Sequence, residues 1–592
     1  MDQSEEKAGT PRVGVYLCHC GGNISDVVDI EGARNLLLKN SPAATVKDYP
    51  FMCSDPGQGL IIEDIRKNGI DRVVVAACSP ALHELTFRNA LQRAGLNAYL
   101  YEHVNIREQV SWVHKEHKDK ATEKAVRLIR AGIEKVMRHD PLTVIQVNAE
   151  HHAVVIGAGP AGMKAALSLA DRGIGVTLIE KDETPGGHLK ELATVFPTAE
   201  EASVLLERFK AQVASRENIS LLCGTRVTDI DGYVGNFTVK TDKGHVVKAG
   251  VIIIATGFRH YSPYGGEMAF QEASATVVTL PAFIKGLSEV SGRDGTPVFA
   301  GRVIKSIAFI HCVGSMQREG LHQPGPEGRL NDYCSRYCCA AVLHSINDLL
   351  DRFPSVQVYD VYKDIRTYGR GQEQYYEDAS KKGVLFFRCS QDMDPSVTLK
   401  DGSCEISLKD VLTWNEEVVF QADLVVLATG MMPGELPELV DSLKLPLGSD
   451  GFLQEVHPKL RPVELANSGV FIAGTCQGPM TVPEACAAAE AAAVKASILL
   501  SSPMISLDPF VAEVDKELCT GCGLCMGECS YKGALALTED DSGKKHARVN
   551  PALCKGCGAC AAVCPHRAIA VAGWTLDQFD AMIDAITATI NR

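Results

Sequence analysis

Eight cysteines near the carboxyl end of the chain stand in two runs of one spacing, Cys-x2-Cys-x2-Cys-x3-Cys. The first run is Cys519, Cys522, Cys525 and Cys529, and the second is Cys554, Cys557, Cys560 and Cys564. This spacing lets three thiolates of one run surround a [4Fe–4S] cubane, while the fourth cysteine ligates the other cluster. We therefore expect one cluster on Cys519, Cys522, Cys525 and Cys564, and another on Cys554, Cys557, Cys560 and Cys529. A zinc ribbon would show two CxxC pairs instead.

Four more cysteines follow three short apolar segments, 13–17, 46–52 and 73–77, which have the composition of strands. Cys18 and Cys20 follow the first segment, Cys53 the second and Cys78 the third. Helical patterns between them predict a parallel sheet, whose carboxyl edge brings such loops together. We therefore expect these thiols to converge on one iron–sulfur cluster, and the alternative is four ordinary buried cysteines.

The same pattern predicts the other elements of this first domain. We expect helices at 28–38, 60–67 and 84–93, a fourth strand at 98–101, and a long charged helix from about 107 to 138.

A third group of cysteines begins with Cys312, at the end of another apolar segment. Cys334, Cys338 and Cys339 follow as a Cys-x3-Cys-Cys run. We expect a second non-standard cluster here, because the run offers more thiols than a disulfide needs. A redox disulfide and buried structural cysteines are the alternatives. The remaining cysteines are expected to be structural: Cys223, Cys389, Cys404, Cys476 and Cys486.

The totals fit a folded protein of a reducing compartment. The chain has 592 residues and 21 cysteines, and its first ten residues lack the apolar core of an export signal. Cytosolic cysteines stay reduced, so metal or redox sites in a cytoplasmic protein are expected. The net charge of −14 argues against nucleic acid as a partner. Acidic and basic residues interrupt segment 482–500, so we expect a buried helix there and no membrane span.

Residues 152–180 read as a strand, a glycine-rich turn, a small-residue helix and a second strand. In the turn, Gly157 allows the tight bend, Gly159 lets the backbone approach a pyrophosphate, and Gly162 lets helix and strand pack closely. The helix N-terminus offers free N–H groups to phosphates, and Glu180 would accept hydrogen bonds from a ribose. The segment predicts dinucleotide binding rather than a purely structural turn, with these contacts: Gly157, Gly159, Pro160, Ala161, Gly162, Glu180 and Lys181.

Later segments resemble the two-dinucleotide flavoproteins, the group of thioredoxin reductase and glutathione reductase. They are Pro185–Leu189, Val251–Gly257, the strand ending in Ala428-Thr-Gly430, and Gly469–Thr475. In that family such segments hold FAD, so the resemblance adds these flavin contacts: Gly187, His188, Leu189, Ala255, Thr256, Gly257, Gly430, Gly474 and Thr475. FAD itself would be the redox centre, and no side chain is assigned a catalytic role. Only Gly314 stands where the family's second nucleotide site has three glycines, so no nicotinamide site is expected.

These patterns predict the α/β class: a parallel-sheet amino-terminal domain, a thioredoxin-reductase-like flavoprotein, and an α+β 2[4Fe–4S] ferredoxin domain. The expected boundaries are 1–150, 151–505 and 506–572, followed by a carboxyl-terminal helix at 573–592. Within the flavoprotein, 296–424 is expected to be an insertion similar to a degenerate NAD domain, between the FAD segments 151–295 and 425–505.

Over essentially its full length the chain resembles the A subunit of heterodisulfide reductase and its bacterial relatives. Besides the glycine turn and the ferredoxin runs, the resemblance rests on Cys18–Asn23, Ala77–Pro80, His83-Glu84, Asn105–Gln109 with Trp112, Val234–Thr238, Cys312–Ser315, Tyr333–Cys339 and Gly474–Pro479. It implies an FAD and iron–sulfur oxidoreductase subunit in which FAD exchanges electron pairs for single electrons, with electron bifurcation or confurcation. Many members carry an extra ferredoxin domain after the segment matching Gly235–Lys240, and this chain lacks it, which puts bifurcation in question. Segment Val195–Thr198 also lacks the cysteines that often follow it in the family.

The resemblance also implies partners. They are subunits similar to heterodisulfide reductase B and C, a hydrogenase- or dehydrogenase-type electron donor or acceptor, and ferredoxin, with a homodimer inside a larger complex. One alternative is a self-contained NAD(P)H-linked iron–sulfur flavoprotein reductase similar to the small subunit of glutamate synthase. Another is a scaffold whose flavin site is vestigial. The single glycine near Gly314 argues against the first alternative, and the intact turn at 157–162 argues against the second.

Overall fold

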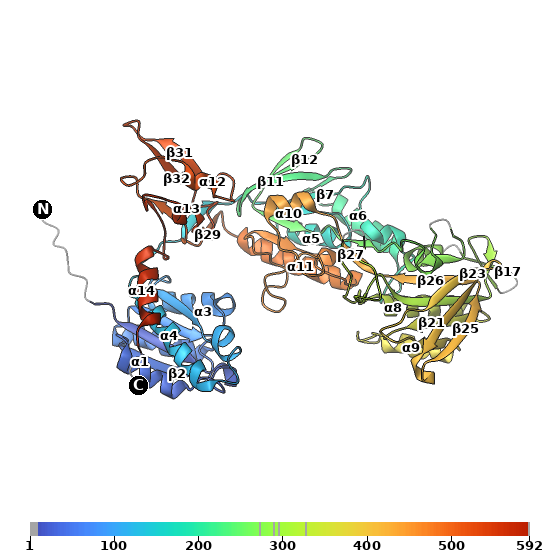
Figure 1. Ribbon diagram of the computed structural model, residues 1–592. Helices are drawn as coiled ribbons and strands as arrows, with labels where there is room; N and C mark the ends of the chain where they lie inside the picture. The colour runs from blue at the N-terminus through green and yellow to red at the C-terminus, as the bar shows by residue number, and fades with distance from the viewer. Residues whose placement is uncertain (1–9, 272–273, 288–289, 294–295, 326–327, 590–592) are drawn as a thin grey trace. The chain divides into compact units, whose positions relative to one another are not determined.

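The structure, a computed structural model, divides into two compact units. They are Met1–Val147 together with Ser506–Arg592, and Asn148–Ile505. Residues 10–271, 274–287, 290–293, 296–325 and 328–589 are described, and Figure 1 shows them as a ribbon. Residues 1–9, on which the expected lack of an export signal rests, lie outside the described residues.

The amino-terminal part of the first unit is a parallel sheet with helices between its strands. Its strands are β1 (Val13–Cys18), β2 (Thr45–Tyr49), β3 (Arg72–Ala77) and β4 (Tyr101–Asn105), in the order β2-β1-β3-β4. Its helices are α1 (Ile30–Asn40), α2 (Asp55–Asn68), α3 (Pro80–Ala94) and α4 (Lys118–Val136). The predicted parallel sheet is confirmed, although β4 begins at Tyr101 rather than at Ala98.

The expected single helix from 107 to 138 is wrong. A π-helical turn covers Arg107–Ser111, and α4 starts only at Lys118. The turn places the Arg107 guanidinium over the Trp112 ring, 4.6 Å from its centroid, and within hydrogen-bond reach of a thiol described below. Single π turns are frequent at functional sites.

Local sequence explains where the helices beside the cysteine loops begin. The side chain of Ser54 accepts a hydrogen bond from the Gly57 N–H at the start of α2, and Pro56 fits the first turn, whose N–H groups have no helical partner. Gly69 ends α2 in a left-handed conformation with φ 65°. Asp29 caps α1 in the same way as Ser54 caps α2. These caps fix the points at which the chain leaves the sheet edge.

The carboxyl-terminal part of the first unit is a small repeat of two strand pairs and two short helices. The elements are β30 (Ala512–Val514) with β33 (Ile569–Val571), β31 (Leu535–Glu539) with β32 (Lys545–Val549), α12 (Leu524–Gly527) and α13 (Ala559–Ala562). A capping box at Thr575 and Gln578 starts the last helix, α14 (Leu576–Thr587), which packs against α4 (Figure 1). The predicted amphipathic carboxyl-terminal helix is therefore present.

The second unit contains two parallel sheets. The first has the order β10-β7-β6-β14-β28, from β10 (Ile219–Leu222), β7 (Gly175–Ile179), β6 (His152–Ile156), β14 (Val251–Ile254) and β28 (Val470–Ile472). Against it pack α5 (Pro160–Ala170), α6 (Ala202–Ala214) and α11 (Val482–Leu499). Helix α11 packs closely on α5 through buried alanines, as expected for a buried helix. Among the described residues, no helix has the length and apolar character needed to cross a bilayer.

The second sheet has the order β16-β26-β20-β21-β22. Its strands are β16 (Val277–Thr279), β26 (Leu424–Thr429), β20 (Ser306–Val313), β21 (Gln357–Tyr362) and β22 (Leu385–Arg388), and α8 (Cys338–Arg352) covers one face. The expectation that the strand ending at Gly430 joins the FAD segments is wrong, because β26 pairs with β16 and β20. Both β26 and β14 end in Ala-Thr-Gly, so the sequence alone did not distinguish their sheets.

Smaller elements connect these sheets. The strands are β5 (Ile145–Asn148), β8 (Thr194–Val195), β9 (Glu200–Glu201), β11 (Val227–Tyr233), β12 (Asn236–Thr241), β13 (Val246–Ala249), β15 (Phe258–His260), β17 (Ser291–Arg293), β18 (Thr296–Phe299), β19 (Arg302–Val303), β23 (Ser396–Lys400), β24 (Ser403–Asp410), β25 (Glu416–Ala422), β27 (Met431–Pro433) and β29 (Met504–Leu507). The helices are α7 (Leu280–Leu287), α9 (Glu373–Lys381) and α10 (Pro437–Leu443). Strands β12 and β13 form a tight hairpin where many relatives were expected to carry the extra ferredoxin domain.

Candidate iron–sulfur and flavin sites

The two carboxyl-terminal cysteine runs line two separate pockets. Cys519, Cys522 and Cys525 line one pocket together with Cys564, the last cysteine of the second run. The other pocket is lined by Cys554, Cys557 and Cys560 with Cys529, the last cysteine of the first run. The crossed grouping expected from the spacing is thus the grouping that the fold brings together, and four soft thiol ligands per pocket suit an iron–sulfur cubane.

Backbone N–H groups point at the sulfur atoms of these pockets. The N–H of Ala547 donates to Cys519 Sγ at 3.5 Å, and the N–H of Ala512 donates to Cys554 Sγ at 3.3 Å. The N–H of Ala568 donates to Cys564 Sγ at 3.3 Å. Such bonds stabilise negative charge on cluster sulfurs, so the pockets are preorganised for thiolates.

The four amino-terminal cysteines converge at the carboxyl edge of the first sheet. Cys18 ends β1, Cys53 lies between β2 and α2, and Cys78 directly follows β3, the strands flanking β1 being β2 and β3. Cys20 has a left-handed backbone with φ 53°, which is rare for a non-glycine residue. Strained backbone of this kind is concentrated at functional sites, and here it turns the Cys20 sulfur back toward the sheet edge.

An arginine serves this amino-terminal site. Arg107 Nη1 donates to Cys20 Sγ at 3.2 Å. Burial raises the pKa of the Cys78 thiol to about 12, and the positive charge of Arg107 opposes that rise. Burial likewise raises the pKa of Cys18 and Cys53. Buried thiols that resist ionisation need a cation or a metal to become thiolates, and a cluster would supply it.

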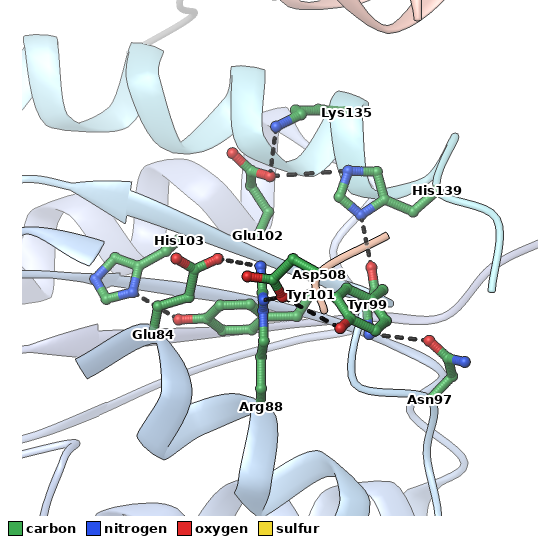
Figure 2. A network of polar contacts seen from close by, with 10 residues as sticks. All are labelled: Glu84, Arg88, Asn97, Tyr99, Tyr101, Glu102, His103, Lys135, His139 and Asp508. Atoms are coloured by element: carbon green, nitrogen blue, oxygen red, sulfur yellow. Dashed lines mark hydrogen bonds and ion pairs between the residues drawn. The ribbon is translucent and has the colours of Figure 1, made fainter. Parts of the chain in front are cut away.

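Behind Cys78 lies the polar network shown in Figure 2. His103 Nε2 lies 2.8 Å from the carbonyl oxygen of Cys78, and its Nδ1 lies 2.6 Å from the Tyr101 hydroxyl. Beside them, Arg88 forms ion pairs with Glu84 and, at 3.0 Å, with Asp508. The network therefore joins the loop of one cysteine to the segment that leads into the ferredoxin-like repeat.

The third cysteine group lines a pocket at the carboxyl edge of the second sheet. Cys312, Cys334, Cys338 and Cys339 face this pocket, and so do three cationic side chains, Arg336, Lys363 and Arg366. The backbone N–H of Arg336 donates to Cys334 Sγ at 3.3 Å. Four thiols surrounded by positive charge fit an anionic iron–sulfur cluster.

A bulge in β20 aims Cys312 at this pocket. The pairing of β20 with β26 shifts register between Ile310 and Val313, and Cys312 adopts φ 62°. Bulges of this kind redirect a side chain next to functional sites. The following Gly314 packs so closely on the Tyr261 ring that an added Cβ would collide with it. No helix follows β20 until α8 begins at Cys338, so the strand–turn–helix needed to bind a nicotinamide dinucleotide is absent from this described segment.

The glycine turn between β6 and α5 has the geometry that a dinucleotide needs. A Cβ on Gly157 would collide with the carbonyl oxygen of Ala255, and one on Gly162 with that of Gly157. A Cβ on Gly159 would meet nothing closer than the Gly187 Cα at 4.0 Å, so this side of the turn is open. Gly159 is the N-cap of α5 and offers no side chain to the first helical N–H groups. The open turn at a helix N-terminus fits a pyrophosphate.

Two side chains near the turn also bear on FAD. The hydroxyl of Thr256 is buried and has no hydrogen-bond partner among the described residues, so a bound flavin can satisfy it. Glu180 is buried, and its carboxylate already accepts from the N–H of Ala158 at 2.7 Å and of Asp182 at 3.0 Å. Each carboxylate oxygen has a further lone pair, so a ribose can still bind.

The other expected flavin contacts fall into two groups. Gly187, His188 and Leu189 lie in a short helix after the Gly186 turn, where His188 Nδ1 is 3.0 Å from Glu191 Oε2. Gly257, Gly474 and Thr475 lie at the carboxyl ends of β14 and β28 in the first sheet. Gly430 instead lies against Ser335 and Ser315, beside the third cysteine pocket. Lys181 is exposed.

Sequence reasoning missed the residues that surround the sulfurs. Arg107, His103, Lys363, Arg366, His311 and Asp360 come from segments remote from the cysteines that they approach. The string from Asn105 to Gln109 was the one available signal, because its charged residues directly follow an apolar strand.

Two family models match the parts of the chain that carry these sites. Residues 151–281 match the pyridine nucleotide-disulphide oxidoreductase family, and residues 512–571 match the 4Fe-4S dicluster domain. Together with the open glycine turn and the crossed cysteine pockets, they define an oxidoreductase that carries FAD and [4Fe–4S] clusters.

Relatives cover nearly the whole chain. It is 35% identical over 618 residues to an iron–sulfur A subunit (the second of two) of the CoB–CoM heterodisulfide reductase of Methanopyrus kandleri, covering 90% of this chain and 92% of the relative. It is 34% identical over 634 residues to the A subunit of the H(2):CoB-CoM heterodisulfide,ferredoxin reductase of Methanothermobacter thermautotrophicus, covering 93% of each. The chain belongs to the family of heterodisulfide reductase A subunits. Among solved structures, T. acidophilum thioredoxin reductase matches 59% of this chain and 98% of its own, with 18% identity and a TM-score of 0.41.

Proposed function

We propose that the chain is the flavin and iron–sulfur electron-transfer subunit of a heterodisulfide-reductase-like complex. When bound, FAD supplies the exchange between electron pairs and single electrons, and [4Fe–4S] clusters carry the single electrons. The observation that carries this proposal is the presence, in one chain, of an open glycine turn and of pockets each lined by four cysteines.

The residues have separate tasks in this proposal. The Gly159 turn and the first N–H groups of α5 hold the pyrophosphate, and the Thr256 hydroxyl donates to or accepts from the flavin. Glu180 orients the adenosine ribose. The Gly187–Leu189 segment, with Gly257, Gly474 and Thr475, closes around the rest of the cofactor.

Sixteen cysteines would hold four clusters. Two sets line the crossed pockets of the ferredoxin-like repeat, a third is Cys18, Cys20, Cys53 and Cys78, and the fourth is Cys312, Cys334, Cys338 and Cys339. We assign these sets to an amino-terminal iron–sulfur domain (1–150), a flavoprotein (151–505) and a ferredoxin domain (506–572), with 573–592 as a terminal helix. The FAD and iron–sulfur domains would then exchange electrons within a single polypeptide.

The proposed partners follow from the same assignment. We place the chain in the cytoplasm, because 21 free cysteines suit a reducing compartment. Subunits similar to heterodisulfide reductase B and C and a hydrogenase- or dehydrogenase-type subunit would supply the terminal sites, with ferredoxin as a further acceptor and a homodimer at the centre. Bifurcation or confurcation would occur only in that assembled complex.

The test is anaerobic purification followed by cofactor analysis and co-purification. We expect one FAD and about sixteen iron atoms per chain, four for each of four cubanes, and co-purification with iron–sulfur subunits in a stoichiometric complex. About eight iron atoms per chain would limit the clusters to the ferredoxin domain. Uncrossed one-electron potentials of the flavin in the complex would exclude bifurcation and leave a simple relay.

A further inference from the structure

A fully buried histidine–aspartate pair lies behind the third cysteine pocket. His311 is on β20 and Asp360 on the neighbouring strand β21, and neither side chain has any exposed surface. His311 Nε2 is 2.7 Å from Asp360 Oδ1. Neither residue lines the pocket, and both were absent from the motifs that the sequence suggested. Ionisable side chains are rarely placed in a core unless the site uses them.

The contacts of the imidazole define where its protons lie. A carboxylate can only accept, so Nε2 carries a hydrogen toward Asp360. Within the described part of the chain, Nδ1 has no oxygen or nitrogen partner, and the group with which it interacts is the thiol of Cys339. An unprotonated Nδ1 would place its lone pair against that sulfur. A protonated Nδ1 donates to it and also gives the buried carboxylate its counter-charge.

Two adjacent cysteines record the effect of the imidazole. Burial raises the pKa of Cys338 well above its ordinary value. Burial acts on Cys339 in the same direction, but the hydrogen bond and the charge of His311 outweigh it and lower the pKa of Cys339. The two residues share one helix start and one degree of burial, so the difference in their environments is His311.

We propose that His311, held by Asp360, donates an Nδ1–H···Sγ hydrogen bond to the Cys339 ligand of the cluster in this pocket and thereby raises that cluster's reduction potential. The inference rests on the third and fourth clusters of the proposed function. Reduction adds one electron to the cluster, and no bond to His311 forms or breaks. The added negative charge spreads onto the ligand sulfurs, so a charge-assisted donor stabilises the reduced state more than the oxidised state.

The other cysteine pockets lack this arrangement among their described contacts. In the ferredoxin-like repeat, the donors to Cys519, Cys554 and Cys564 are uncharged backbone N–H groups. Asp360 keeps the imidazole oriented and is a positioning residue, since it touches His311 and not the sulfur. The pair is therefore a tuning device for one cluster of the chain.

Asp360→Asn is the variant that removes the hydrogen bond and leaves every cysteine and His311 in place. The amide oxygen of the new side chain can still accept from Nε2, so the imidazole becomes neutral with its proton on that atom. Nδ1 then stops donating to Cys339. A second variant, His311→Leu combined with Asp360→Leu, removes the donor and the buried charge together, so that no charge is left unpaired in the core. Asp423→Asn is the matched control, because Asp423 accepts from the backbone at the opposite end of β20.

The readout is an EPR-monitored redox titration of the full-length protein, purified anaerobically and checked for iron content. The signal of this cluster is identified by its loss in Cys338→Ser. We expect Asp360→Asn and the double variant to retain wild-type iron and to weaken the one-electron reduction at least tenfold, a fall of about 59 mV in midpoint potential. Asp423→Asn should leave the potential unchanged.

Two results have different meanings. Full iron content with an unchanged midpoint in both variants would overturn the role of His311 while leaving the cluster in place. Wild-type iron and an unaltered EPR spectrum in Cys338→Ser would instead show that the pocket holds no cluster, and the proposed function would lose one of its four centres.

Discussion

The ammonium group of Lys135 lies 3.0 Å from the centroid of the Trp574 ring. Lys135 is on α4 and also pairs with Glu102 at 2.8 Å, and its side chain is almost fully buried. Trp574 directly precedes α14. Two further bonds join the same helices: Gln578 Nε2 donates to the Arg138 carbonyl at 3.0 Å, and Arg127 Nη1 donates to the Ile586 carbonyl at 2.7 Å. The last helix of the chain is thus anchored on a helix of the amino-terminal part.

Replacing Trp574 with alanine should loosen this anchor. The substitution removes a cation–π contact worth about 0.5–2 kcal/mol and the ring's packing on α4. We expect hydrogen exchange of the α14 amides to speed up by about five- to thirty-fold, with iron and flavin content unchanged. Trp414→Ala is the control, because that ring is 93% exposed. Equal protection of α14 in both variants would show that the ring does not hold the helix.

Acidification should destabilise the amino-terminal part of the first unit. Burial, with a smaller effect of Lys135, lowers the pKa of His139 to about 4 from an ordinary value of 6.5 (Figure 2). Between these values the unfolded chain binds more protons, so the stabilisation from neutral His139 is complete above pH 6.5 and is lost as the pH falls toward 4. The loss is roughly 2–3 kcal/mol.

The measurement is hydrogen exchange of α4 at several pH values, corrected for intrinsic rates. His139→Asn keeps a donor for the Tyr99 carbonyl, which His139 Nδ1 meets at 3.0 Å, and should flatten the dependence. His117→Asn, at the exposed start of α4, should not. Wild-type and His139→Asn curves of equal slope would mean that another group controls the acid sensitivity.

Two glycines of the flavin turn should respond differently to alanine. A methyl group at Gly162 collides with the Gly157 carbonyl, so Gly162→Ala should destabilise the second unit by about 1–3 kcal/mol and abolish FAD binding. A methyl group at Gly159 finds open space, so Gly159→Ala should fold normally and lose FAD because it fills the phosphate cradle. Circular dichroism and flavin fluorescence of the extract separate the two effects. Full flavin content in Gly159→Ala would place the pyrophosphate elsewhere.

Pairs of cysteine substitutions should reveal which thiols share a cluster. Cys519 and Cys564 line one pocket, so serine at both should lose no more iron than Cys564→Ser alone. Cys529 belongs to the other pocket, so Cys519→Ser combined with Cys529→Ser should lose iron from both. Iron and labile sulfide per chain are the readout. An additive loss from the first pair would mean that each run keeps its own cluster.

NADH and NADPH should not reduce the isolated chain at a catalytic rate. The turn after β20 is occupied by Gly314 against the Tyr261 ring and by the side chain of Cys312, and no helix N-terminus faces it. Stopped-flow absorbance of the flavin after mixing with either nucleotide is the measurement, with dithionite as the positive control. Stoichiometric bleaching within the mixing time would favour the NAD(P)H-linked reductase.

Much of this architecture follows from short-range pattern. The crossed grouping of Cys529 and Cys564 follows from spacing, because a loop of two residues can return a thiolate to the same cubane and a longer one cannot. The strand ends that carry Cys18, Cys53 and Cys78 follow from alternation of strands and helices. What the pattern could not supply depends on tertiary contact. The pairing of β26 with β20, which moves Gly430 to another sheet, is chosen by side-chain packing and not by the Ala-Thr-Gly string. The approach of His311 to Cys339 joins a strand to a helix start, with no local signal in either.

The first unit is built from both ends of the chain, with the 358 residues Asn148–Ile505 between its parts. During synthesis, the amino-terminal sheet leaves the ribosome long before α14 and Trp574 exist. The face of α4 that they cover stays open to water until the last codons are translated, and the cubane on Cys519, Cys522 and Cys525 waits in the same way for Cys564. Maturation is therefore post-translational. Cluster-delivery factors and chaperones must act on a finished chain, and a ribosome that stops early releases a product that can complete neither its surface nor that cluster.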